Sequence, residues 1–343
     1  MDLRLSDEQQ QLVEAFRALY ARESSCERVR AAEPTGFDAT LWRVLVASGV
    51  VEMAVGEAHG GWQASDLDLA LVAEQHGRAV AAAPLIEAQT AAKLLAGCSD
   101  GGNRPAADTL ATALAGETLI TFAPRASRGG RLELLPAGAV ADAAVAMVGD
   151  RVVLVELTEN RVPVENLGSM PLADVDVPPG AAVLAEGEKA SQLFSDAVDH
   201  WLLLTGAALV GIAARAVELG VSYAQQRHAF GKPIGSFQAV SHPLADSATA
   251  VDGARLLAYR AACAVVDQPQ RASELAAMAF VFGYETARDA TYRSLHIHGG
   301  YGFMMEQDVQ LYYRRARGWA NVFAEPGAVL ERVADRRYGT VAS

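Results

Sequence analysis

The hydrophobic positions of the first third of the chain recur at steps of three and four residues. Over residues 6–23 this spacing predicts an amphipathic helix, and a serine followed by two acidic residues is typical of its start. Glycine-rich breaks separate the further helices that the same spacing predicts, at residues 39–48, 65–80, 84–96 and 106–115. We therefore expect a helical bundle at the N-terminus.

The pattern then changes twice. Short β-branched or apolar runs broken by Gly, Pro, Asp and Asn predict strands at residues 118–123, 131–135, 145–148, 152–157, 162–164 and 181–184. Helical spacing returns in four long segments, at residues 190–227, 237–266, 271–298 and 308–337.

The predicted fold is therefore α+β and mainly α. It has an N-terminal helical domain (1–116), a small antiparallel β-domain (117–187) and a C-terminal four-helix bundle (188–343). Small residues such as Gly206, Ala208 and Gly211 in the first long helix permit a wide cavity beside it. A helical scaffold with a β insertion and no chemistry is the alternative at this stage.

Composition and charge narrow the functional classes. With 51% hydrophobic and 20% charged residues among 343, the chain can build a large core. Its 29 Lys and Arg against 41 Asp and Glu leave a net charge of −12, which argues against nucleic-acid binding. Three scattered cysteines predict neither a disulfide framework nor a metal site. With no signal-peptide pattern and no apolar run of about 18 residues, we expect a cytoplasmic protein without a membrane span.

The segment 227–238 joins two of the long helices and offers ligand contacts. Its glycines and proline stop the preceding helix, and Ser236 can cap the next one. An arginine suits a bidentate phosphate contact, aromatic rings pack on a ring system, and an amide reads a base edge. The residues that offer these contacts are Arg227, Phe230, Phe237 and Gln238. An ordinary helix–turn–helix is the alternative reading of this segment alone.

A second segment begins at His296 and contains three glycines within four positions. Gly299 and Gly300 let a bulky ligand approach the backbone closely and expose its N–H groups, although a glycine that simply ends a helix would look the same. Two histidines at i and i+2 do not share a helix face, so we expect packing or hydrogen-bonding roles rather than a metal site.

Together the two segments resemble the acyl-CoA dehydrogenase family over nearly the whole chain. The specific matches are the run Arg-x-x-Phe-Gly-x-Pro-Ile-x-x-Phe-Gln from Arg227, the His-x-Leu-Ala-Asp run from His242, and the His-Gly-Gly-x-Gly-Phe loop. A Glu-x-x-Gly-Gly turn from Glu57 and a Glu-Gln-His-Gly-Arg-Ala helix end from Glu74 support them.

The resemblance implies FAD shared across a subunit interface. Arg227 would meet its pyrophosphate, Phe237 and Gln238 its adenosine side, and the loop from His296 through Gly299 and Gly300 its far end. Phe230 would pack beside it. Arg255 matches an arginine near the thioester-binding region of the family; its alternative role is an i, i+3 ion pair with Asp252.

Two expected features are altered. The family's Thr-Glu-Pro-x-x-Gly-Ser-Asp signature, which covers the flavin, corresponds to a stretch from Thr121 to Arg128 in which only the proline and the serine persist. The base that removes the α-proton is in many relatives a glutamate in a Tyr-Glu-Gly-Thr run, and Phe323 falls at that position. Glu325 is the nearest substitute, and Asp252 lies on the helix that carries the base in other relatives.

The Tyr-Tyr-Arg-Arg run from Tyr312, the reduced β-domain and the missing base resemble a short actinobacterial subgroup of the family. Some members of this subgroup form α2β2 complexes that oxidise the side-chain CoA thioesters of sterols. This resemblance implies an acyl-CoA substrate, a second acyl-CoA dehydrogenase subunit and an electron-transfer flavoprotein as electron acceptor. The alternatives are a self-sufficient homo-oligomer and a non-catalytic structural subunit.

Overall fold

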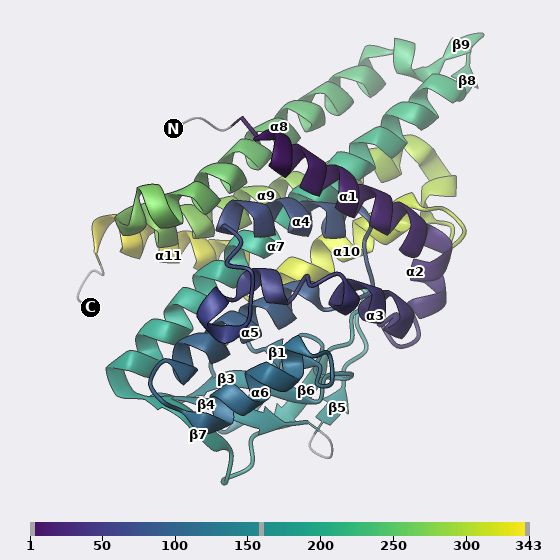
Figure 1. Cartoon of the computed structure of the whole chain (residues 1–343). Coiled ribbons are helices and arrows are strands. Elements are labelled where there is room, and N and C mark those ends of the chain that lie inside the picture. The colour runs from purple at the N-terminus through teal and green to yellow at the C-terminus, as the bar shows by residue number, and fades with distance from the viewer. Residues whose placement is uncertain (1–3, 158–160, 340–343) are drawn as a thin grey trace. The chain divides into compact units, whose positions relative to one another are not determined.

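The computed structural model describes residues 4–157 and 161–339. Helices come first, strands follow, and long helices complete the chain (Figure 1). The first helices are α1 (Asp7–Glu23), α2 (Cys26–Ala32), α3 (Ala39–Ala47), α4 (Asp66–Arg78), α5 (Leu85–Ser99) and α6 (Arg104–Leu114). The strands are β1 (Ile120–Phe122), β2 (Arg131–Leu135), β3 (Ala143–Val148), β4 (Arg151–Glu156), β5 (Arg161–Pro163), β6 (Ala173–Asp176) and β7 (Ala182–Glu186). The later elements are α7 (Gly187–Gln226), β8 (His228–Ala229), β9 (Lys232–Pro233), α8 (Gln238–Asp267), α9 (Pro269–His298), α10 (Val309–Asn321) and α11 (Pro326–Tyr338).

The chain divides into two compact units that are not contiguous in sequence. One unit consists of the described residues up to Val29, of Ala70–Ala81 and of the described residues from Leu202 onward. The other consists of Arg30–Leu69 and Ala82–Trp201. Each unit takes segments from more than one of the three predicted domains, so the three-domain division stays a prediction.

The strand-containing unit has two sheets. One has the strand order β1-β3-β4-β7 and the other β2-β6-β5. The expectation of a purely antiparallel domain is wrong for one pair, because β1 runs parallel to β3. The connection between them passes through β2, which belongs to the other sheet, and such a crossover leaves no local sequence signal. Helix α5 packs on β1 and β3 (Figure 1), and both sheets contribute buried apolar side chains to one core.

In the helical unit α8 packs along α9, and α10 and α11 also pack against α9. A single helix over residues 308–337 was expected, but the chain breaks between α10 and α11. Pro326 is the first residue of α11, and Glu325 before it is extended, with φ −59° and ψ 142°. Proline disfavours the helical conformation of the residue before it, and the extended backbone of Glu325 agrees with a break at this position.

The small residues of α7 serve close helix packing. A side chain on Gly211 would collide with the carbonyl oxygen of Glu74 on α4, and one on Gly206 would press on the backbone of Ala279 on α9. The backbones touch at these positions, so Gly206 and Gly211 allow close packing there and do not line a wide cavity.

Helix α7 is also long and apolar enough, by length and composition, to cross a membrane. Its most apolar 18-residue window has a mean hydropathy of 1.7, and 72% of that window is buried inside the protein. Core helices of soluble proteins have the same properties, so this is weak evidence for a span.

Candidate functional site

The segment between α7 and α8 folds as a tight β-hairpin, at the far end of this helix pair in Figure 1. Phe230 and Gly231 connect its two strands with φ of 53° and 77°. Positive φ at both central residues is typical of a type I′ turn, which glycine adopts freely and phenylalanine only at a cost. The side chain of Phe230 is 95% exposed, so packing against its own chain offsets little of that cost.

The other predicted contact residues surround this hairpin. Arg227 is exposed directly after α7, and its carbonyl accepts from the N–H of Ile234 across the hairpin at 2.8 Å. Phe237 is half-buried, and the ammonium of Lys232 lies 4.5 Å from the centre of its ring. Gln238 opens α8 and is exposed.

The expected serine cap of α8 is wrong. The hydroxyl of Ser236 donates to the carbonyl of Pro233 at 2.7 Å, within the turn. Phe237 takes the cap position without a side-chain hydrogen bond. Ser236 is the last residue of a 3-10 turn over Ile234–Ser236 that precedes α8. It therefore lies one residue before the cap position, from which a side chain reaches the free N–H groups of the helix.

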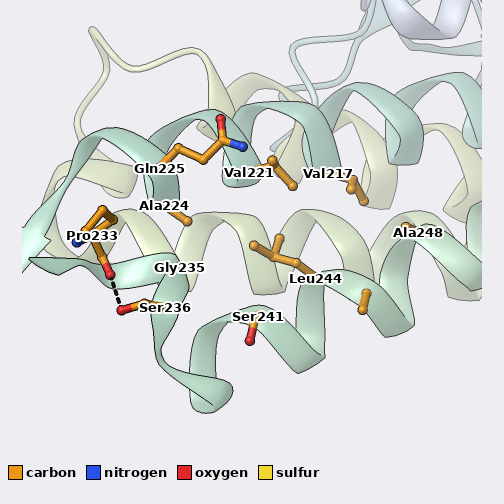
Figure 2. Close-up of a pocket in the computed structure, with 11 residues that line it drawn as sticks. Val217, Val221, Ala224, Gln225, Pro233, Gly235, Ser236, Ser241, Leu244 and Ala248 are labelled. Carbon is orange, nitrogen blue, oxygen red and sulfur yellow. Dashed lines mark hydrogen bonds between the residues drawn. The ribbon is translucent and has the colours of Figure 1, made fainter.

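An apolar cavity of about 530 Å³ lies beside the hairpin, between α7 and the first turns of α8 (Figure 2). Val217 and Val221 of α7 face Leu244 of α8, while Pro233 and Ser236 close one end, as Figure 2 shows. None of the seven predicted cofactor-binding residues lines this cavity. The hairpin therefore borders an apolar cavity on one side, in addition to exposing polar side chains.

The glycine loop follows α9 directly. Gly299 has φ 63° and ψ −143°, and a Cβ atom on Gly299 or Gly300 would meet no heavy atom within 4 Å. At Gly302, by contrast, a Cβ would clash with the carbonyl of Leu295. Packing within the chain explains Gly302, whereas Gly300 has neither a positive φ nor a neighbour that requires glycine. Open backbone at Gly299 and Gly300 suits the close approach of a ligand from outside the chain.

The two histidines of this loop have different surroundings. His296 is exposed and stacks on Tyr292 with 6.1 Å between ring centres. His298 is buried, stacks on Tyr223 at 4.3 Å, and places Nδ1 2.7 Å from the carbonyl oxygen of Ser294. Because Tyr223 lies four residues before Arg227, this stack holds the ends of α7 and α9 together. The hairpin and the glycine loop are thus placed at the same end of the helical unit.

Arg255 lies on α8 in an ion-pair network. Its Nε donates to the buried Glu74 of α4 at 2.9 Å, and its Nη1 donates to Asp252 at 2.9 Å. The hydroxyl of Tyr259 donates to the same Glu74 at 3.3 Å. Burial, the largest single cause, acts to lower the pKa of the Arg255 guanidinium, but the charge and hydrogen bond of Glu74 together with the charges of Tyr259 and Asp252 raise this pKa above its usual value. The predicted i, i+3 pair with Asp252 is confirmed, and two carboxylates occupy the guanidinium.

Comparison with known proteins identifies the family. Two family models match, the acyl-CoA dehydrogenase N-terminal domain over residues 6–100 and the acyl-CoA dehydrogenase C-terminal domain over residues 193–320. Acyl-CoA dehydrogenase IpdE2 of Mycolicibacterium smegmatis is 31% identical over 96% of this chain and 98% of its own length. The chain belongs to the acyl-CoA dehydrogenase family. Members of this family are FAD-dependent oxidoreductases that act on CH–CH donors.

Solved structures share this acyl-CoA dehydrogenase fold. The ChsE4–ChsE5 complex from Mycobacterium tuberculosis has a TM-score of 0.87 at 23% identity, with 100% of both chains covered. A Tcur3481–Tcur3483 steroid ACAD variant has a TM-score of 0.83 at 24% identity, covering 96% of this chain and 98% of the other. At these identities the likeness shows the fold.

The position that the resemblance predicts for the catalytic base holds a packed ring. Phe323 is half-buried just after α10 and meets Phe280 edge to face, with 6.2 Å between ring centres. Glu325 is exposed at the start of α11 and makes no capping hydrogen bond. Asp252 is exposed on α8 and pairs with Arg255. Neither carboxylate is enclosed in an apolar pocket of the kind that tunes a general base.

The stretch that corresponds to the flavin-covering signature of acyl-CoA dehydrogenases also has a packed ring where the family has a polar side chain. With the prolines aligned, Phe122 stands in place of the signature threonine, and it is fully buried with its ring centre 5.6 Å from that of Phe194. Ser127 then falls one position before the signature serine, where Arg128 stands. A hydroxyl that could meet a ligand is thus replaced by a ring in the core.

Sequence reasoning missed two contacts that build this site. Glu74 was predicted only as part of a family motif, although a glutamate directly after the apolar run at residues 69–73 is a signal for a buried charge partner. Tyr223 gave no signal, because its stack on His298 joins two helices that are distant in sequence.

Proposed function

We propose that this chain is one subunit of a heteromeric FAD-dependent acyl-CoA dehydrogenase that acts on a bulky, steroid-derived acyl-CoA thioester. It supplies the clamp for the pyrophosphate and adenosine end of FAD. A second family subunit supplies the flavin face and the catalytic base, and an electron-transfer flavoprotein accepts the electrons.

One contrast carries this proposal. The residues of the proposed clamp are open to a ligand, because Arg227 is exposed and a Cβ atom on Gly299 or Gly300 would meet no heavy atom of the described chain within 4 Å. The base position is occupied by Phe323, which packs on Phe280 and cannot accept a proton. Binding residues without the proton acceptor favour a site that two different chains complete.

The residues of the clamp fit FAD. The guanidinium of Arg227 offers the planar donors that match a pyrophosphate, and the glycine loop allows a ring system to lie against the backbone. The exposed ring of Phe230 and the half-buried ring of Phe237 lie edge to face, 6.1 Å apart, and add an aromatic surface. When bound, FAD accepts the β-hydride of the acyl thioester, while this chain's residues hold and orient the cofactor.

The surface around the glycine loop supports a partner subunit. Four large apolar side chains are exposed in and directly after the loop, at 46–68% of their surface. They are Tyr301, Phe303, Met304 and Met305. Aromatic residues and methionine are enriched in interfaces between subunits.

The substrate class and the heteromer rest on the relatives. The ChsE4–ChsE5 structure is that of a complex of two named chains, and the Tcur3481–Tcur3483 structure is described as a steroid ACAD. Relatedness to IpdE2 over nearly the full length of both chains places this protein beside an acyl-CoA dehydrogenase of similar size.

A self-sufficient homo-oligomer is the second candidate, and Glu325 favours it. This carboxylate is exposed at the break between α10 and α11, two residues beyond Phe323, without a capping bond that would fix it. A rearrangement of this break would bring it toward a substrate. A subunit that binds no flavin is the remaining alternative.

Variants in a reconstituted enzyme separate these possibilities. The chain is co-expressed with each acyl-CoA dehydrogenase family member that a neighbouring gene encodes. Retained flavin and acyl-CoA turnover are then measured for Arg227→Gln, for Glu325→Gln and for the matched control Arg260→Gln, which alters an exposed arginine on α8. We expect Arg227→Gln to weaken flavin retention at least tenfold, because a charged hydrogen bond to a phosphate is lost. Glu325→Gln and Arg260→Gln should leave turnover unchanged. A loss of turnover of about 100-fold or more in Glu325→Gln would instead establish the self-sufficient enzyme.

A further inference from the structure

A second cavity of about 320 Å³ lies where the ends of α1 and α4 meet α7 and α10. Its volume is at the lower end of the range for small-molecule sites. Unlike the apolar cavity beside the hairpin, it has a polar wall. The wall residues that matter for its chemistry are Arg17, Ser24, Gln75, Arg78, Arg215 and Tyr312.

Positive charge exceeds negative charge around this cavity. Arg78 Nη2 and Arg215 Nη1 donate to the same oxygen, Oε2 of Glu218, at 2.6 and 2.9 Å. The third arginine, Arg17, has its Nε 3.4 Å from the neutral amide oxygen of Gln75. Within the described chain no carboxylate pairs with Arg17. Three guanidinium groups against one carboxylate leave a local charge of +2 on a chain whose net charge is −12.

A buried hydroxyl in the same wall is unsatisfied. Ser24, the residue after α1, is 7% exposed, and its Oγ has no hydrogen-bond partner among residues 4–157 and 161–339. Most buried polar groups are paired, because leaving one unpaired costs free energy. A ligand with acceptor oxygens would give this hydroxyl its partner and would neutralise the excess positive charge.

The arginines are held in place before any ligand arrives. Glu218 fixes the guanidinium groups of Arg78 and Arg215 relative to each other by accepting from both. The phenol of Tyr312, which is buried on α10, donates to the carbonyl of Arg78 at 3.0 Å. This bond satisfies the end of α4, so the guanidinium groups are not needed to cap that carbonyl. Pre-organised donors bind an anion at a lower entropic cost than free ones.

We propose that this cavity binds a small oxyanion that carries at least two negative charges, with the phosphate group as its preferred ligand. Arg17 contributes a guanidinium free of acidic partners, Arg78 and Arg215 contribute a rigid cationic pair, and Ser24 contributes a hydroxyl donor. The bound anion joins the end of α1 to α4, α7 and α10, so its binding stabilises the helical unit.

The probe is inorganic phosphate, titrated into the full-length protein at constant ionic strength by exchange against sodium chloride. Calorimetric heats and thermal unfolding are both recorded, alone and in the flavin-containing complex. We expect saturable binding and a rise of the melting temperature with phosphate. Arg17→Gln should weaken the affinity at least tenfold, since a charged hydrogen bond is lost. The matched control Arg43→Gln, an exposed arginine of α3 in the other unit, should not change it.

A second variant keeps the test independent of folding. Ser24→Ala removes an unpartnered hydroxyl, so the melting temperature without phosphate should stay the same or rise, while the affinity for phosphate falls. Succinate in parallel distinguishes the source of the anion: tighter binding that Arg17→Gln also weakens would support the oxyanion site and assign it to dicarboxylates. The absence of saturable binding of both anions, or equal losses in Arg17→Gln and Arg43→Gln, would overturn the proposal.

Discussion

Phe323 and Arg255 are two single side chains whose contacts bear on the proposed site. Phe323, at the position that the resemblance assigns to the base, makes an edge-to-face contact with Phe280. Arg255 is held by Glu74 and Asp252. The roles that the motifs assign to these two positions stay predictions. Their partners on other helices could not be predicted, because a local pattern contains no information on which distant helix packs against it.

The contacts of Arg255 predict a stabilising role that needs no substrate. Replacing it by glutamine leaves the buried Glu74 without its cationic partner, and we expect the free energy of unfolding to fall by about 2 kcal/mol, less than for a fully buried pair because Arg255 is partly exposed. Denaturant unfolding without acyl-CoA measures this, with Arg260→Gln on the same helix as the control. Unchanged stability together with a raised KM for acyl-CoA would show that Arg255 binds substrate instead.

His200 predicts a pH dependence of stability in the strand-containing unit. Burial, and then the charge of Lys93, lower its pKa to about 3 against the opposing charge of Asp66. The unfolded chain protonates this histidine at about pH 6.5, whereas the folded chain stays neutral. The contribution of neutral His200 to the free energy of unfolding is therefore complete above pH 6.5. It is lost as the pH falls toward 3, by about 1.4 kcal/mol per pH unit.

The test compares the free energy of unfolding at pH 7.5 and pH 5.5. The decrease over this interval should be about 1.4 kcal/mol smaller in His200→Gln than in the wild type, because the unfolded variant gains no proton there. His59→Gln, which alters a more exposed histidine of the same unit, should keep most of the wild-type decrease. Equal decreases in His200→Gln and the wild type would contradict the assignment.

Among the elements, periodicity predicted the long helices well and their interruptions poorly. Helices α7, α8 and α9 begin and end within a few residues of the expected positions. The break at Pro326 and the parallel pairing of β1 with β3 were not anticipated. The break follows from a proline that could have been read locally, whereas the pairing depends on chain topology that a local pattern does not carry.

The close contact of Gly211 on α7 with α4 predicts that a larger residue at this position lowers the stability of the protein strongly. Gly211→Ala places a methyl group against the carbonyl of Glu74, so the two helices must separate, and we expect a loss of about 3 kcal/mol in the free energy of unfolding. Gly253→Ala on α8 is the matched control, since its Cβ would make an ordinary contact with Phe282 and should stabilise by about 0.5 kcal/mol or more. Similar small effects of both substitutions in denaturant unfolding would disprove the close helix contact.

At the hairpin of β8 and β9, we expect one substitution to raise the stability of the protein and to weaken flavin binding. Phe230→Gly relieves the positive φ at that position, and the free energy of unfolding should rise by about 1 kcal/mol. The same variant removes an exposed aromatic ring, so flavin retention in the complex should fall. Thermal unfolding and flavin content of the same preparations measure both; a variant that retains flavin fully would show that Phe230 is not part of the clamp.

At the scale of the whole molecule, the sequence predicted the family correctly, and it also predicts the proposed division of cofactor binding between two subunits. The residues of the proposed clamp include the exposed Arg227, while the positions that the resemblance assigns to the base and to the flavin-covering threonine hold the packed rings of Phe323 and Phe122. This asymmetry is readable because both motifs have fixed spacing. The two non-contiguous units were not readable, because they are defined by contacts between distant segments.

The most direct test of the shared-site account is the number of flavins bound per chain, counted from visible absorption for the chain purified alone and with a co-expressed family partner. The account predicts a colourless protein alone and about one flavin for each pair of unlike chains in the complex, bleached by a steroid-derived acyl-CoA. About one flavin per chain in the protein alone, bleached by an acyl-CoA without any partner, would contradict it and establish a self-sufficient dehydrogenase.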